Sequence, residues 1–127
     1  MEFDYTIITA KTFDETVQSV QDEIAKASMR VLYVHDVQKT LNEKGFVREP
    51  FKIIEFCSAK YANEFLNKDI KIGLCLPCKI NVYTKDGQIF ISGMRPIVLR
   101  QFFPQADLGE RPKEIDQIIQ NIINNTK

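Results

Sequence analysis

The hydrophobic and polar positions near the N-terminus change period, and the change separates two elements. In residues 3–11 apolar and polar side chains alternate, which predicts a strand. Beyond residue 12 the apolar positions recur at steps of four and three, which predicts an amphipathic helix of about 16 residues. Thr12 and Glu15 have the spacing of a capping box and mark its start. The apolar stripe of this helix consists of Phe13, Val17, Val20, Ile24 and Ala27.

The middle of the chain alternates apolar runs with helical patterns. Residues 29–34 form a short run rich in strand-forming side chains, and a short helix over 36–44 is expected to end at Gly45. The near-continuous apolar run 51–57 predicts a strand with both faces largely covered. Ser58 is placed to cap the helix that follows.

Asp86-Gly87 is the sequence of a two-residue type I′ turn between the strands 79–84 and 88–93. Such a turn determines the pairing of the two strands, because each residue is then opposite a defined partner. The expected pairs are Val82 with Ile91 and Thr84 with Ile89 on one face, and Tyr83 with Phe90 and Asn81 with Ser92 on the other. The Tyr83 and Phe90 pair is expected to meet solvent or a partner.

The C-terminal third begins where Arg95-Pro96 breaks the last strand. Residues 97–103 form an apolar connector with no clear periodicity. Pro112 has the position of a first-turn proline, and isoleucines at helical spacing follow it. We therefore expect a C-terminal amphipathic helix, with Ile115, Ile118, Ile119 and Ile122 on its apolar side.

Composition narrows the class of protein. The 127 residues are 44% hydrophobic and 27% charged, which is typical of a single globular domain spanning residues 1–127. Seventeen basic and seventeen acidic residues give a formal net charge of zero, so no long-range field favours nucleic acid or a membrane surface. The acidic start has no secretory signal pattern and every apolar stretch is interrupted, so we expect a cytoplasmic protein with no membrane partner.

Several of these segments together resemble the domain of unknown function 302 family. The resemblance rests on residues 31–36, Gly45, residues 53–57 and 76–83, Asp86-Gly87 and residues 94–96. It implies an α+β fold of two layers, similar to the TATA-box-binding-protein-like folds. In that fold a curved, largely antiparallel sheet of about five strands carries helices on one face. The resemblance also implies a homodimer and implies no activity, and many members lack cysteines at positions 57 and 78.

The most distinctive chemistry of the chain is its three cysteines, Cys57, Cys75 and Cys78. Free cysteine is often simply packed as a small hydrophobe, which is one interpretation. Under a redox interpretation, Cys57 precedes a helix N-terminus that would lower its pKa, and Cys75 and Cys78 have CxxC spacing. Cys78 runs into a strand, however, whereas a thioredoxin-like CxxC opens a helix.

A third interpretation is a zinc-type metal site. Its ligands would be His35, the only histidine, together with Cys57, Cys75 and Cys78. If the helix 36–44 crossed between parallel strands, His35 and Cys57 would lie at one edge of the sheet. A largely antiparallel sheet would separate them.

Asp36 and Glu55 are possible accessory carboxylates near the same edge, although neither has a paired base or nucleophile. The leading hypothesis is a domain that binds a small ligand or handles a thiol at Cys57, Cys75 and Cys78, without being a self-sufficient enzyme. The alternative is an interaction module in which the cysteines only pack. In that case Tyr83 and Phe90, or the C-terminal helix, would form the contact.

Overall fold

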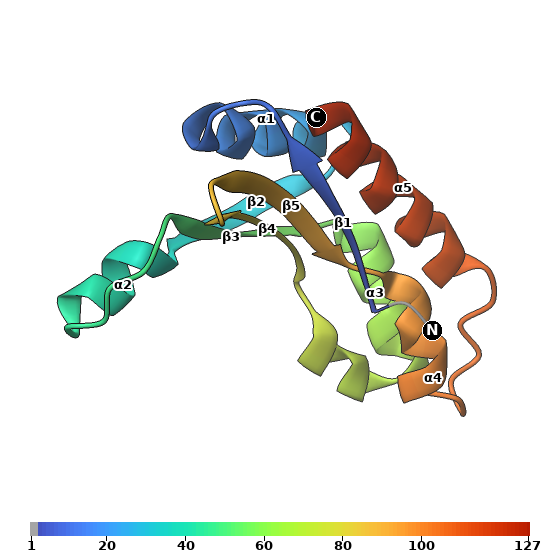
Figure 1. The fold of residues 1–127 in the computed structure, drawn as a ribbon. Coiled ribbons are helices and arrows are strands. Elements are labelled where there is room, and N and C mark those ends of the chain that lie inside the picture. The colour runs from blue at the N-terminus through green and yellow to red at the C-terminus, as the bar shows by residue number, and fades with distance from the viewer. Residues whose placement is uncertain (1–2) are drawn as a thin grey trace.

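The computed structural model describes residues 3–127 and places a sheet and several helices in two layers (Figure 1). Helices on one side of an antiparallel sheet confirm the α+β class expected from the sequence. The elements in chain order are β1 (Asp4–Thr9), α1 (Phe13–Lys26), β2 (Arg30–Asp36), α2 (Val37–Glu43), β3 (Phe51–Cys57), α3 (Ala59–Lys68), the 3-10 helix η1 (Ile70–Cys75), β4 (Cys78–Lys85), β5 (Gln88–Met94), the 3-10 helix η2 (Pro96–Val98), α4 (Leu99–Phe102) and α5 (Arg111–Thr126).

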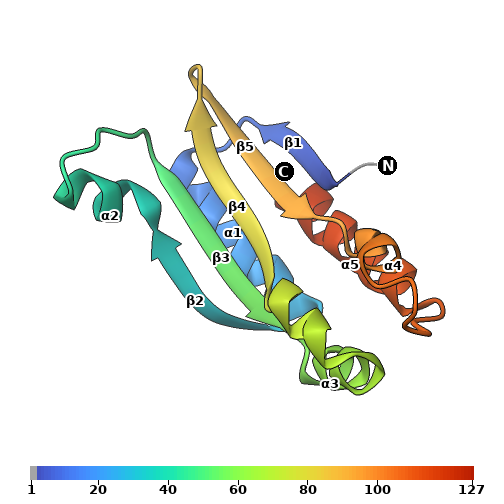
Figure 2. The same ribbon diagram turned by 90° about the horizontal axis from the view of Figure 1, so that it is seen from below.

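The strands of the described chain form one sheet in the order β1-β5-β4-β3-β2, and every neighbouring pair is antiparallel. Helices α1 and α5 lie side by side over one face, and the other face is open (Figure 2). The parallel crossover considered for residues 36–44 is therefore wrong. Helix α2 instead connects two antiparallel neighbours and projects beyond one end of the strands, while α3 and η1 gather at the opposite end.

The hydrophobic core lies between the sheet and the helices. Alternate residues of β3, β4 and β5 point toward α1 and α5, because side chains on a strand have a period of two. Most of these positions are buried, and so are most inward positions of the two helices. The core side chains with 0% exposure include Ile54, Phe56, Ile80, Val82 and Ile91 from the sheet, Val20 and Ile24 from α1, and Ile123 from α5.

Local signals set the beginnings of the helices as expected. The capping box forms at α1, with the Glu15 amide donating to the Thr12 hydroxyl at 3.2 Å and the Thr12 amide donating to the Glu15 carboxylate at 3.4 Å. Pro112 lies in the first turn of α5. Gly45 follows α2 with a φ of +88°, a conformation that glycine adopts without strain.

The expected hairpin is confirmed in every pair. Asp86 and Gly87 have φ values of +51° and +77°, as a type I′ turn requires. Val82 pairs with Ile91, Thr84 with Ile89, Tyr83 with Phe90 and Asn81 with Ser92. The turn thus directs one set of side chains into the core and the other set onto the open face.

The connector 97–103 folds into η2 and α4 and returns toward the sheet end where β5 finishes. The Arg95 guanidinium donates to both oxygens of Asp116 on α5, at 3.1 Å from Nε and 3.0 Å from Nη2. This half-buried pair ties the end of β5 to the last helix. Within the described residues, no helix is both long and apolar enough to cross a bilayer.

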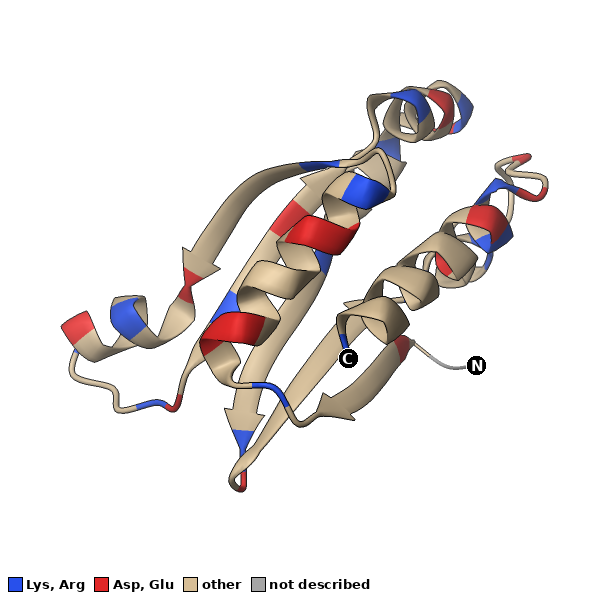
Figure 3. Ribbon diagram, turned by 90° about the horizontal axis from the view of Figure 1, so that it is seen from above, with Lys and Arg blue, Asp and Glu red and all other residues tan. Residues whose placement is uncertain are grey.

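Charged side chains are interspersed over the helical side of the molecule. Basic and acidic residues occur along α1, α2 and the beginning of α5, and neither sign forms a continuous stripe in this view (Figure 3). The pattern is consistent with the zero formal net charge of the chain.

Candidate functional site

The three cysteines gather at the end of the sheet next to α3. Cys57 is the last residue of β3, Cys75 the last of η1 and Cys78 the first of β4. Phe56 pairs with Cys78 across the β3 and β4 ladder, so Cys57 and Cys78 lie on neighbouring strands at the same end. All three cysteines are free, and as whole residues they are partly exposed, although the thiol of Cys78 is itself largely buried. The structure therefore brings together the thiols that the sequence singled out.

A cavity of about 290 Å³ lies beside the segment 74–79, which we call the cysteine loop. We call this hollow the loop cavity. It is partly enclosed between the cysteine loop and the segment formed by η2 and α4. Hydrophobic side chains and the thiols of Cys75 and Cys78 make most of its wall. Its lining comes from the cysteine loop, from Pro96, Leu99 and Phe102, and from Phe3, Phe65, Met94 and Ile115.

The pKa of the Cys57 thiol differs from the expectation. Its pKa is raised rather than lowered, because burial disfavours the thiolate. The residue precedes the cap of α3, and the Tyr61 amide of the first turn already donates to the Ser58 hydroxyl at 3.5 Å. The predicted lowering of the Cys57 pKa is therefore wrong.

Burial also raises the pKa of Cys78, to about 11, with a further contribution from the neighbouring Cys57. Lys79 acts in the opposite direction and is the smaller effect. A thiol with this pKa is protonated at neutral pH, and the thiolate is the nucleophilic form. Cys78 therefore behaves as a neutral, mostly apolar part of the wall.

His35 lies away from the cysteines. It pairs with Ile53 across β2 and β3, four residues before Cys57, which is roughly 13 Å along the strand. Its Nε2 lies 2.6 Å from Glu55 Oε1, and its ring contacts Tyr33 edge to face. The metal site of His35 with three cysteines is therefore wrong. Throughout residues 3–127, no three His, Cys, Asp or Glu side chains are grouped as metal ligands.

The accessory carboxylates have structural partners. Asp36 caps α2, since its Oδ1 accepts a hydrogen bond of 3.0 Å from the Lys39 amide. Glu55 Oε1 lies within hydrogen-bonding distance of His35 Nε2 on the open face of the sheet. Neither carboxylate lines the loop cavity.

The open face of the sheet carries a row of aromatic rings. Phe51, Tyr83 and Phe90 stand on three adjacent strands and stack with ring centroids 5.4 and 5.3 Å apart. Beyond them, the segment after α2 exposes Phe46 and Val47, the latter 99% exposed. The expectation that Tyr83 and Phe90 share a face away from the core is confirmed.

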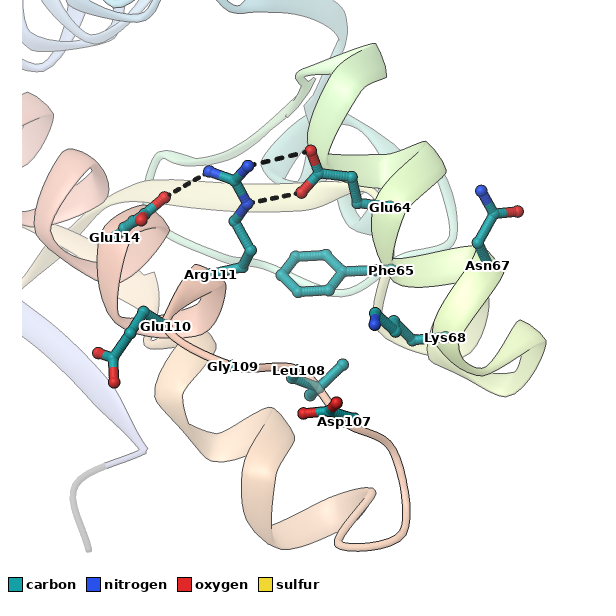
Figure 4. A pocket seen from close by; sticks show the side chains of 10 residues that line it. All are labelled: Glu64, Phe65, Asn67, Lys68, Asp107, Leu108, Gly109, Glu110, Arg111 and Glu114. Atoms are coloured by element: carbon teal, nitrogen blue, oxygen red, sulfur yellow. Dashed lines mark hydrogen bonds and ion pairs between the residues drawn. The ribbon is translucent and has the colours of Figure 1, made fainter.

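A second hollow, of about 460 Å³, lies between α3 and the start of α5 (Figure 4). Three of its charged side chains form ion pairs with one another: Arg111 Nε lies 2.7 Å from Glu64 Oε2, and Arg111 Nη1 lies 2.8 Å from Glu114 Oε2. The guanidinium also lies over the Tyr61 ring, 5.6 Å from its centroid. This hollow is a wide surface depression in which the arginine is already paired with two glutamates.

Sequence reasoning found the cysteines of the loop cavity but missed the residues opposite them. Phe3, Met94, Leu99 and Phe102 come from segments far from the cysteines in the chain. The apolar connector 97–103 was the available signal, since a surface loop rarely needs so many large apolar side chains.

A model of the family described as domain of unknown function DUF302 matches residues 5–126. The chain belongs to this family. A crystal structure of an uncharacterized conserved DUF302 protein from Bacillus stearothermophilus has the same fold, with a TM-score of 0.93 and 26% sequence identity over all of both chains. None of the curated proteins compared with the chain matches it.

Proposed function

We propose that this DUF302 domain binds a small, mainly apolar ligand in the loop cavity. The observation that carries the proposal is a partly enclosed hollow of about 290 Å³ with a mostly hydrophobic wall. Ligand sites are usually concave and apolar with few polar groups, and they start at about 300 Å³. The ligand is thus small, of the size of a single ring system or a medium-length alkyl chain.

Packing, and not covalent chemistry, holds the ligand in this proposal. Burial raises the pKa of both Cys57 and Cys78, which keeps these thiols protonated at neutral pH. Thiols in this state contribute polarizable, weakly polar surface to the wall. Three free cysteines also favour a reducing compartment such as the cytoplasm as the location.

A neutral fluorescent probe tests the proposal. N-phenyl-1-naphthylamine is expected to brighten on binding the wild-type protein and to raise its melting temperature, because a ligand that binds only the folded state stabilises it. Cys75→Trp places an indole against the wall of the cavity and is expected to abolish both effects.

The matched control for this variant is Gln18→Trp, which adds the same side chain at an exposed position of α1, outside the cavity and away from the open face of the sheet. The control should bind the probe like the wild type. Circular dichroism establishes that both variants are folded. Equal probe binding by the folded Cys75→Trp variant and the wild type would refute the loop cavity as the site.

A second candidate function is supported by the open face of the sheet. We propose that a second copy of the chain covers this face to form a homodimer. The row of Phe51, Tyr83 and Phe90 would then be removed from water, and the exposed Phe46 and Val47 would extend the contact. Aromatic side chains are enriched at the centres of such interfaces.

The area of the face agrees with this proposal. The described chain has five strands of 6 to 8 residues, which at about 4.8 Å between strands and about 3.4 Å per residue gives a face of roughly 500 Å². Two copies would bury about 1,000 Å², the lower bound for a specific interface.

Sedimentation equilibrium of the wild type is expected to give twice the mass of the chain, and Tyr83→Asp should give the monomer mass. The charge-matched control is Asn121→Asp, at an exposed position of α5. Asn121 Oδ1 already accepts a hydrogen bond from Gln117 Nε2, and a carboxylate oxygen at this position can do the same. A monomeric wild type, or a Tyr83→Asp dimer as tight as the wild type, would exclude this interface.

A further inference from the structure

One charged side chain lines the loop cavity. Among its lining residues in the described part of the chain, Lys79 alone carries a formal charge, and the wall contains no aspartate or glutamate. The cavity therefore has an apolar interior with a single positive charge at its boundary.

The Lys79 ammonium has no internal counter-ion in residues 3–127, where it forms no ion pair. The nearest carboxylate by register is Glu55, its partner across β3 and β4. Glu55 Oε1, however, lies 2.6 Å from Nε2 of His35, which belongs to β2. Strand β2 lies on the opposite side of β3 from Lys79. Lys79 is exposed, so its charge remains available to a ligand that reaches the boundary of the cavity.

We propose that the ligand is an anionic amphiphile, with an apolar tail in the loop cavity and a carboxylate at Lys79. This inference rests on the proposed function, because it names the chemical class of the ligand bound at the same site. An anion beside Lys79 gains a charge-assisted hydrogen bond, which a neutral head group lacks. A cationic head group would instead lie beside a like charge.

Three ligands with the same ten-carbon tail separate charge from apolar contact: decanoate, decanol and decyltrimethylammonium. Decanoate and decyltrimethylammonium are used below their micelle concentrations, and decanol below its solubility limit, to displace N-phenyl-1-naphthylamine from the wild-type protein at neutral pH. Decanoate is expected to bind about fivefold more tightly than decanol, the range of an exposed charge pair. Decyltrimethylammonium should bind more weakly than either, and added salt should reduce the advantage of decanoate.

Lys79→Gln keeps most of the side-chain length and removes the charge. In this variant decanoate should lose its fivefold advantage, while decanol should bind as it does to the wild type. The control is Lys85→Gln, which removes the same charge from the other end of β4, outside the cavity. It should leave the order of the three ligands unchanged.

The possible results distinguish the two proposals. Equal affinity of decanoate and decanol for the wild type, or an unchanged decanoate advantage in Lys79→Gln, would overturn the anionic class and leave an apolar site standing. If none of the three displaces the probe, or the probe itself does not bind, both the loop cavity as a ligand site and the inference built on it fail.

Discussion

The two faces of the sheet are made from the same strands and differ in what covers them. On the covered face, Ile80, Val82 and Ile91 are 0% exposed beneath α1 and α5. On the open face, Tyr83 and Phe90 alternate with these residues and stack in a row that no helix covers. The covered face thus supplies the stability of the monomer, whereas the open face is available for a partner.

The largest expected effect on stability compares one substitution on each face of the sheet. Ile80→Ala leaves a cavity under the helices and should lower the free energy of unfolding by about 2–5 kcal/mol. Tyr83→Ala removes only ring contacts on the open side, so its cost to the monomer should be about 1 kcal/mol. Chemical denaturation at several protein concentrations measures both and separates monomer stability from any contribution of a dimer. Equal losses for the two variants at high dilution would contradict the comparison.

A smaller effect is expected from two neighbouring residues of β5. A Cβ on Gly93 would lie 3.0 Å from Ile123 Cδ1 and 3.3 Å from Ile119 Cγ2, so these tightly packed side chains of α5 would have to give way. Gly93→Ala should therefore destabilise the protein by about 2 kcal/mol.

Ser92 points to the other face, where its Oγ lies 2.6 Å from Thr6 Oγ1. Ser92→Ala should cost about 1 kcal/mol or less. Thermal unfolding of both variants checks this order, and a more stable Gly93→Ala protein would show that α5 packs loosely.

The smallest of the three effects concerns Cys78, which shares the covered side of β4 with Ile80. The folded-state pKa of this thiol is about 11, above its ordinary value of 9.0. An acid whose pKa is raised by folding stabilises the protein below the unfolded pKa, and that stability is lost as the pH rises from about 9 to 11. At pH 10 the loss should be about 1 kcal/mol.

Alkylation checks the same thiol independently. Iodoacetamide followed by peptide mass spectrometry should label Cys78 at least about tenfold more slowly in the folded protein than in urea at pH 8. A Cys78→Ser variant should lose less stability than the wild type between pH 8 and pH 10. Rapid native labelling of Cys78 at pH 8 would show that the thiol is not buried as described.

Short-range signals in the sequence predicted several parts of the fold. Thr12 and Glu15 are three residues apart, and their mutual hydrogen bonds need only the first turn of α1. Asp86-Gly87 determines the turn, and the turn determines every pair of β4 and β5. The cysteines were recognised as the distinctive chemistry, and the structure gathers them at one end of the sheet.

Long-range pairing decided what the sequence left open. A sequence pattern predicts that residues 29–34 and 51–57 are strands, but not that they run antiparallel, and this direction separates His35 from Cys57. The same limitation applies to Cys57, whose neighbours in the chain suggested a lowered pKa, whereas its neighbours in space raise it by burial. The periodicity of a sequence shows which side of a helix or strand is apolar, but it does not show which other element packs against that side.

By itself, the sequence determined the helix caps, the hairpin register and the presence of three thiols, because each depends on residues close together in the chain. The α+β class was expected only from the resemblance to the family, which draws on segments spread over the whole chain. The tertiary structure alone decided that Phe3, Met94, Leu99 and Phe102 meet the cysteine loop around a cavity with Lys79 at its boundary. Cavities arise where segments distant in the chain pack incompletely, and their shape is a property of that packing rather than of any local pattern.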